Sequence, residues 1–305
     1  MPTTAIVLSG GGNKGPIQVG ALQSLLEHSI RPDFLVGTSA GSLNSGFMAA
    51  HGPTLPAIPR LAEAWRSATR ETVYPGNPLT VAWRVLKGQD IIFPSDGLRR
   101  LIVTHLPAGV THFGQLKCPC FVTAVDLQSR RLYLFGEDPG APLVEALMAS
   151  SVVPAFHPPV MYHGLQLVDG GVVTVTPVGV AMEKGAKRIF AVNVHMGTEP
   201  LPPAHGVLKI FSRTLDTFTA QSLFQDLEAA AADPTVELHY IHIPAFSGIA
   251  FDDFSQTDAM IAEGKRATDA YLEHPQPSYV APARAADEPL HRVPGAREYV
   301  PRRWR

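Results

Sequence analysis

The stretch FLVGTSAG at residues 34–41 decides the fold. Its first three residues form an apolar run typical of a buried strand, and a helical pattern over 40–50 follows at once. Gly37 and Gly41 flank Ser39 in the pattern G-x-S-x-G, which leaves room for a sharp strand-to-helix turn. Such a turn strains the serine backbone and holds its hydroxyl above the sheet edge, beside the positive end of the helix. Because the pattern is short, a glycine-flanked turn with an idle serine is the alternative.

A second glycine-rich turn lies near the start of the chain. The apolar run at residues 5–8 leads into SGGGNKG at 9–15, and a helical pattern follows. Consecutive glycines allow backbone N–H groups to approach a ligand closely and to point at developing negative charge. We therefore expect an oxyanion hole in the loop of Gly10, Gly11 and Gly12, with the last two amides as the main donors.

The third feature is an aspartate between an apolar stretch and two glycines. The sequence LVDGG at residues 167–171 ends a predicted strand. Gly170 and Gly171 allow Asp169 to approach another backbone loop without a Cβ clash. Functional groups gather at the carboxyl ends of strands in open α/β sheets, and all three motifs follow strands. We therefore expect them at one edge of the sheet.

Taken together and in this order, these motifs resemble the patatin-like phospholipase family. The matching stretches are Gly10–Gly15, Gly37–Gly41, Asp169–Gly171 and ASSVVPAFHPPV at 149–160. The resemblance extends from about Thr4 to about Pro177. It implies a serine acyl hydrolase with a Ser–Asp dyad, in which Ser39 is the nucleophile and Asp169 is the base. The implied substrate is a lipid carboxylic ester, either a phospholipid or a lysophospholipid.

One departure from the family pattern concerns the loop after the aspartate. The chain has Thr-Val-Thr at residues 174–176, where the family often carries asparagines. This difference puts the local hydrogen bonding of the loop in doubt, but not the dyad.

Other interpretations of the same residues stay open. Ser39, Asp169 and His195 follow the chain order of an α/β-hydrolase triad, and His195 ends a predicted strand, where it can line the pocket. The Gly10–Gly15 loop also fits the dinucleotide pattern G-x-G-x-x-G, but Ser39 stands where the ribose-binding acid belongs. An acyltransferase would use the same dyad. A non-catalytic lipid-binding protein is disfavoured because both dyad residues are present.

The alternation of strand and helix patterns predicts a three-layer α/β/α fold with a mostly parallel central sheet. The expected strands are 5–8, 33–38, 120–126, 131–135, 165–168 and 188–194, and the expected helices are 15–29, 40–50, 55–69, 95–105, 142–150, 177–184, 208–227 and 255–272. The expected strands at 120–126 and 131–135 are predicted to form a hairpin. We expect a catalytic domain over 1–275 and a disordered Pro- and Arg-rich tail over 276–305.

Two irregular segments carry aromatic side chains. Residues 72–95 are interrupted by prolines and glycines and form a candidate lid, and residues 244–254 are a candidate for closing the acyl-chain pocket. A packed surface loop is the alternative for both.

The composition is that of a globular protein with little net charge. The 305 residues are 45% hydrophobic and 17% charged, and a formal net charge of −2 gives no case for nucleic acid. The chain has no charged-then-apolar leader and no uncharged apolar run near the roughly 18 residues that span a bilayer, so we expect a cytoplasmic protein. A weak peripheral contact with an anionic membrane is the alternative role for the tail.

The chain has two cysteines, and they are close together. Cys118 and Cys120 lack a partner cluster of His or Cys, so we expect them to be buried small hydrophobes. We expect neither a metal site nor any other cofactor.

Overall fold

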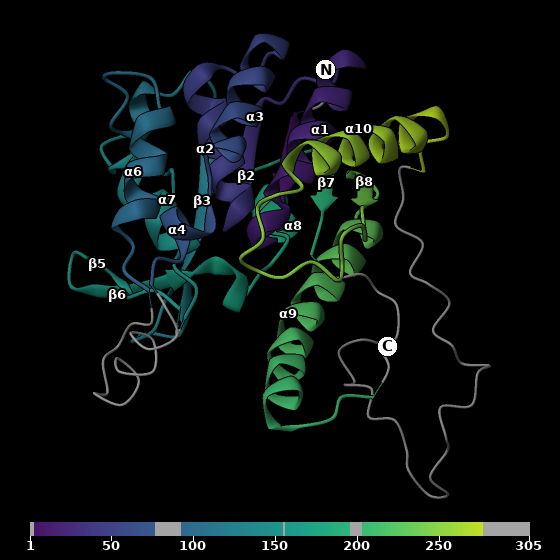
Figure 1. Cartoon of the computed structure of the whole chain (residues 1–305). Coiled ribbons are helices and arrows are strands. Elements are labelled where there is room, and N and C mark those ends of the chain that lie inside the picture. Colours follow the sequence, from purple (N-terminus) through teal and green to yellow (C-terminus); the bar gives the residue numbers. More distant parts are fainter. Residues whose placement is uncertain (1–2, 77–92, 155, 196–202, 277–305) are drawn as a thin grey trace, which may run out of the picture.

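The computed structural model describes residues 3–76, 93–154, 156–195 and 203–276 (Figure 1). These residues form an eight-stranded sheet in the order β5-β6-β3-β2-β1-β7-β8, with β4 paired to β3 outside this path. The strands are β1 (Thr4–Leu8), β2 (Phe34–Thr38), β3 (Cys120–Asp126), β4 (Arg131–Phe135), β5 (Val160–Tyr162), β6 (Leu165–Asp169), β7 (Arg188–Asn193) and β8 (Glu237–His242). The pairs β1–β2, β1–β7, β2–β3 and β7–β8 are parallel.

Helices cover both faces of this sheet. They are α1 (Gly15–Glu27), α2 (Ala40–His51), α3 (Ile58–Arg66), α4 (Arg70–Val73), α6 (Asp96–His105), α7 (Leu143–Ser151), α8 (Val178–Glu183), α9 (Val207–Ala232) and α10 (Thr257–Glu273). Short 3₁₀ turns are η1 (Gly12–Lys14), η2 (Leu55–Ala57), η3 (Phe113–Gln115) and η4 (Gly170–Val172). The predicted three-layer α/β/α fold with a mostly parallel sheet is confirmed.

Alternate residues of β1 belong to two different cores. Ile6 and Leu8 lie in the core shared with α1, α2, α3, α6, α7 and α10, whereas Ala5 and Val7 lie in the core shared with α8 and α9. Figure 1 shows the two groups of helices on either side of the sheet. Burial on both faces explains why this strand reads as a continuous apolar run rather than an alternating one.

Helix α10 packs on α1 with the two backbones in contact. A Cβ atom on Gly20 would overlap the carbonyl oxygen of Ile261, and one on Gly264 would overlap the carbonyl oxygen of Ile17. Glycine at both positions is therefore needed for this close approach.

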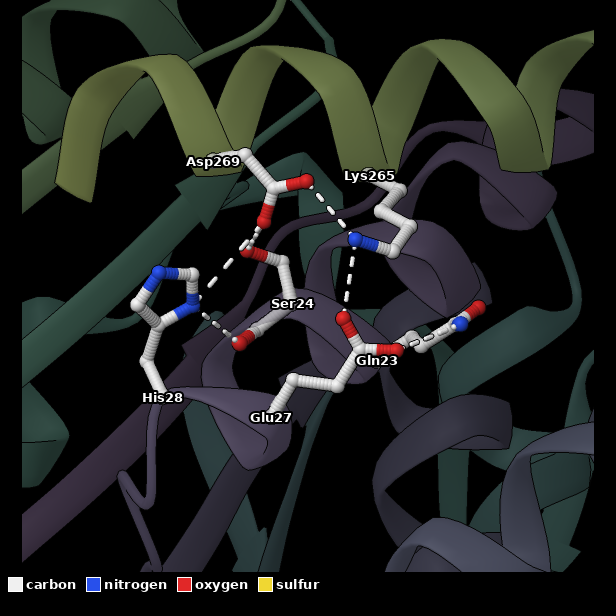
Figure 2. Close-up of polar contacts among 6 residues, drawn as sticks. All are labelled: Gln23, Ser24, Glu27, His28, Lys265 and Asp269. Atoms are coloured by element: carbon white, nitrogen blue, oxygen red, sulfur yellow. Dashed lines mark hydrogen bonds and ion pairs between the residues drawn. The ribbon is translucent and has the colours of Figure 1, made fainter. Parts of the chain in front are cut away.

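Polar side chains flank the α1–α10 contact (Figure 2). The Ser24 hydroxyl donates to Asp269 at 2.6 Å, and the Lys265 ammonium lies 2.8 Å from Glu27 and 2.7 Å from Asp269. These contacts attach the last helix of the described chain to the helix that follows the glycine-rich loop.

Strand β6 reaches the sheet edge in a different way from the one expected. It is antiparallel to β3, with Asp169 opposite Ala124, whereas β2 is parallel to β3, with Thr38 opposite Thr123. The rule about the carboxyl ends of parallel strands is therefore the wrong reason for the position of Asp169. Strand β3 continues past the end of β2, and β6 pairs with this extra part of β3. Strand β6 therefore ends, at Asp169, near the level at which β2 ends at Thr38.

Several smaller predictions can be compared with the structure. The hairpin of 120–126 with 131–135 is confirmed as β3 and β4. The predicted helix over 55–69 is instead η2 followed by α3, and strands β5 and β8 were not predicted. Residues 77–92 of the candidate lid and 277–305 of the predicted tail lie outside the described residues.

Both cysteines have the buried positions expected. Cys118 and Cys120 are free thiols in the first core. Burial raises the pKa of the Cys118 thiol to about 11, so it stays protonated at neutral pH. Within the described residues, no helix combines the length and apolar character needed to cross a membrane.

Candidate active site

Ser39 lies between the end of β2 and the start of α2 in a strained backbone conformation. Its φ of 54° and ψ of −123° fall in a region that residues other than glycine seldom adopt. A Cβ on Gly37 would overlap the carbonyl oxygen of Gly41, and a Cβ on Gly41 would overlap that of Leu8. The glycine spacing read from the sequence thus corresponds to a real backbone contact on both sides of the serine.

Side chains from two helices hold the Ser39 backbone. The Ser39 amide donates to the Oγ of Ser150 on α7 at 2.9 Å, and the Ser42 hydroxyl donates to the Ser39 carbonyl at 2.6 Å. Ser42 and Ser150 are fully buried. The strained turn is therefore fixed by hydrogen bonds as well as by packing.

Asp169 lies beside the Ser39 side chain. The Ser39 hydroxyl is close enough to the Asp169 carboxylate to lower its pKa, and the same carboxylate accepts a hydrogen bond from the Gly171 amide at 2.7 Å. Ser39 is 8% exposed and Asp169 is 5% exposed. Burial raises the pKa of Asp169 to about 6, while the Ser39 hydroxyl and the Gly171 amide act in the opposite direction. The carboxylate is thus ionised at neutral pH yet more basic than an exposed aspartate.

Two threonines join the strands that carry these residues. Thr38 and Thr123 share a hydrogen bond of 2.7 Å between their hydroxyls, and Thr38 also donates to the carbonyl oxygen of Thr174 at 3.1 Å. A Cβ on Gly170 would overlap the Thr123 hydroxyl, so Gly170 allows the aspartate loop to lie against β3. At the position where the family pattern differs, the backbone of Thr174 takes part in this network.

The glycine-rich loop lies beside Ser39. A Cβ on Gly10 would be 3.4 Å from the Cβ of Ser39. The Gly10 amide donates to the Val175 carbonyl at 2.8 Å, so this amide is already occupied. Gly11 has a φ of 176° and a ψ of 2°, and Gly12 is left-handed, with a φ of 57°. Of the three glycines expected to form an oxyanion hole, Gly11 and Gly12 keep that candidate role.

His195 follows β7 near this loop, but its ring is not joined to the serine and the aspartate. Its carbonyl accepts from the Lys14 ammonium at 3.3 Å, and its amide donates to the Asn193 side chain at 2.9 Å. Burial, and then the charge of Lys14, lower the pKa of His195 to about 4. Among the described residues, no hydrogen bond links the imidazole to Ser39 or Asp169.

An aromatic cluster lies next to the site. The sequence did not predict that its members come together. Tyr74 lies at its centre, with ring centroids 5.1 Å from Phe251, 5.4 Å from Phe93 and 6.3 Å from Phe156. Burial, and then the charges of Asp169 and Asp252, raise the pKa of Tyr74 to about 12. The available signal was the presence of aromatic side chains in both irregular segments, 72–95 and 244–254.

A separate pocket of about 460 Å³, including its open mouth, lies in the helical layer. It is lined mainly by apolar side chains of α2, α3, α6 and α7, among them Leu43, Phe47, Trp65, Leu101 and Leu147. Neither Ser39 nor Asp169 lines it, so this pocket is separate from their site. Among the described residues, no group of three or more His, Cys, Asp or Glu side chains is placed to hold a metal ion.

Comparison with known protein families identifies the family of this chain. The model of the patatin-like phospholipase family matches residues 6–182, which include the glycine-rich loop, Ser39 and Asp169. The chain belongs to the patatin-like phospholipase family. Helices α9 and α10, strand β8 and the loop between β8 and α10 lie beyond the matched residues.

Individual proteins that resemble this chain do so at low sequence identity. Lysophospholipase NTE1 of Scheffersomyces stipitis is 26% identical over 208 residues, and lysophospholipase NTE1 of Mycosarcoma maydis is 27% identical over 208 residues. Each alignment covers 66% of this chain but only 12% and 10% of the relative, so the chain spans about a tenth of their length. Among solved structures, VipD from Legionella pneumophila has a TM-score of 0.47 and 14% identity over 89% of this chain and 67% of that one.

Proposed function

We propose that this patatin-like chain hydrolyses carboxylic esters of lipids, namely phospholipids or lysophospholipids, with Ser39 as the nucleophile and Asp169 as the base. The observation that carries the proposal is the position of the strained Ser39 beside the buried Asp169 carboxylate, whose pKa is lowered by the Ser39 hydroxyl and raised by burial. Membership of the family and the lysophospholipase relatives support a lipid substrate.

The first half of the reaction forms an acyl-enzyme. The Ser39 oxygen attacks the ester carbonyl carbon while its proton passes to Asp169. The carbonyl oxygen becomes an oxyanion, and the amides of Gly11 and Gly12 stabilise it. When this intermediate collapses, the C–O bond to the alcohol breaks, and the leaving oxygen takes the proton from Asp169.

The second half releases the fatty acid. A water molecule gives its proton to Asp169 and attacks the acyl carbon, and the bond to Ser39 then breaks as the serine oxygen regains a proton from Asp169. The raised pKa of Asp169 supports this role, because a carboxylate with a pKa of about 6 accepts a proton more readily than one near 4.

Apolar side chains around the site favour a lipid over a polar ester. Val172 and Val173, which directly follow the aspartate glycines, are 42% and 37% exposed, and Phe251 of the aromatic cluster is 50% exposed. An acyl chain would cover these side chains and remove them from water.

Two alternatives use the same residues and are separated by simple measurements. In a Ser–His–Asp esterase the imidazole would lie between Ser39 and Asp169, but the hydrogen bonds of His195 among the described residues run through its backbone and not to either of them. An acyltransferase would transfer the acyl group from Ser39 to an acceptor other than water. Product identification distinguishes this reaction from hydrolysis.

The proposed function is tested with a panel of phospholipids, lysophospholipids, glycerides and short esters, using wild-type protein and Ser39→Ala. We expect free fatty acid and the matching alcohol from wild type, and none above the buffer rate from Ser39→Ala. Ester cleavage that persists in Ser39→Ala would contradict the proposal.

A further inference from the structure

Asn13 lies in the glycine-rich loop but makes its side-chain contacts with a distant part of the chain. Its Nδ2 donates to the carbonyl oxygens of Ala250 and Asp253, each at 2.7 Å. Asn13 is 6% exposed, so both amide hydrogens have protein partners in a buried place. The partners are 237 and 240 residues away, in the loop between β8 and α10.

We name residues 246–254 of this loop the strap. The strap has its own internal turn, because the Asp253 amide donates to the Ala250 carbonyl at 3.0 Å. Asp252 accepts from Arg70 of α4 at 2.8 Å, and Phe251 packs on Tyr74. The strap is therefore anchored on both the glycine-rich loop and the aromatic cluster beside Asp169.

We propose that Asn13 is a positioning residue, which fixes the glycine-rich loop against the strap and so sets the place of the Gly11 and Gly12 amides beside Ser39. This inference rests on the proposed function. The strap follows the residues that the family model matches, so a C-terminal segment outside that match holds the loop in place.

The position of Asn13 in the loop explains why its side chain has this effect. Asn13 directly follows Gly11 and Gly12, two residues without side chains that could anchor the loop themselves. Gly12 is exposed, and a Cβ there would meet no atom within 4 Å. An oxyanion hole works only when its donors are held in place before the reaction, and misplacement of a donor slows the chemical step more than substrate binding.

The test compares Asn13→Ala and Asn13→Asp with wild type on a soluble ester. Aspartate keeps the size of asparagine, but its ionised carboxylate cannot donate to the two carbonyl oxygens. We expect kcat to fall about 10- to 100-fold in both variants while KM stays within about threefold, since loss of a whole oxyanion donor costs about 100- to 1000-fold.

Ser24→Ala is the matched control, because Ser24 is a fully buried polar residue of α1 that also bonds across to the C-terminal segment (Figure 2). It should lower the melting temperature like the Asn13 variants but leave kcat within about threefold. Equal loss of kcat in Ser24→Ala would mean that Asn13 acts only through general stability, and would overturn the inference.

Hydrogen exchange separates failure of this inference from failure of the proposed function. In Asn13→Ala, amides of residues 11–14 and of the strap should exchange faster together, and in Ser24→Ala they should not. An active wild type with full kcat in Asn13→Ala contradicts the positioning role alone. If wild type cleaves no ester, the proposed function fails, and unchanged exchange would then show that Asn13 does not hold the loop either.

Discussion

The backbone amide of Ser39 donates a hydrogen bond of 2.9 Å to the side-chain oxygen of Ser150. Ser150 lies in the last turn of α7, 111 residues further along the chain. The bond satisfies a buried N–H group at a turn whose backbone is strained. It also means that this amide is not a free donor for an oxyanion, which leaves that role to the glycine-rich loop.

Removing the Ser150 hydroxyl should therefore destabilise the protein. We expect Ser150→Ala to lower the free energy of unfolding by about 1–3 kcal/mol, because the Ser39 amide is left buried without an acceptor. The next residue gives the control: the Ser151 hydroxyl is buried and has no partner among the described residues. Ser151→Ala should not lower the free energy of unfolding in the same denaturant titration, because it removes a buried hydroxyl that lacks a partner among the described residues. Equal losses in the two variants would show that the bond to Ser39 carries no special weight.

Asp169→Asn should remove activity while the fold is kept. The amide can still accept from Gly171 but cannot take the proton of Ser39, so kcat should fall by several powers of ten. Steady-state rates on a soluble ester, with circular dichroism as the check on folding, measure this effect. A folded variant with more than a tenth of wild-type activity would exclude Asp169 as the base.

The same substitution should raise stability at neutral pH. The pKa of Asp169 is about 6 in the folded chain and 3.8 in the reference state, so the folded protein binds the proton more tightly. Stability then falls as pH rises from about 4 to 6, and the ionised carboxylate costs up to about 3 kcal/mol above that window. Asp169→Asn should thus melt higher than wild type at pH 7, with the difference shrinking toward pH 5. A lower melting temperature at pH 7 would contradict this account of the buried charge.

The pH dependence of the rate should follow the same carboxylate. Since the base must be ionised, kcat/KM should rise with pH through a midpoint at about 6 and level off above it. His195, with a pKa of about 4, does not titrate in this range. A pH–rate profile on a neutral soluble ester measures the midpoint, and a midpoint at or below 4 would show that the pKa of Asp169 is not raised in the folded enzyme.

His195→Ala decides between a dyad and a triad. Within the described residues no hydrogen bond joins the imidazole to Ser39 or Asp169, so we expect kcat within about tenfold of wild type. Loss of all turnover in a folded His195→Ala protein would favour the Ser–His–Asp alternative.

The local parts of the site could be predicted from the sequence. The turn at Ser39 and the loop at Gly10 depend on glycines within a few residues of each strand end, and parallel pairing of β1 with β2 brings the two together. These features are short-range, so the pattern of the chain indicates them directly.

The long-range parts could not be predicted in this way. The antiparallel pairing of β6 with β3 joins residues more than 40 positions apart, and the contacts of Asn13 join residues more than 230 positions apart. Strand β8 was missed because polar His239 and half-buried Tyr240 interrupt its apolar pattern. Such features are set by pairing and packing across the fold, which a single sequence does not display.

The most direct test of the central claim is to map the residue labelled by a fluorophosphonate probe in wild type, Ser39→Ala and Asp169→Asn. We predict one covalent adduct on Ser39 in wild type, none at this position or elsewhere in Ser39→Ala, and labelling at least about 100-fold slower in Asp169→Asn. An adduct on another residue, or a labelling rate in Asp169→Asn equal to that of wild type, would contradict the assignment of Ser39 as the nucleophile and Asp169 as its base.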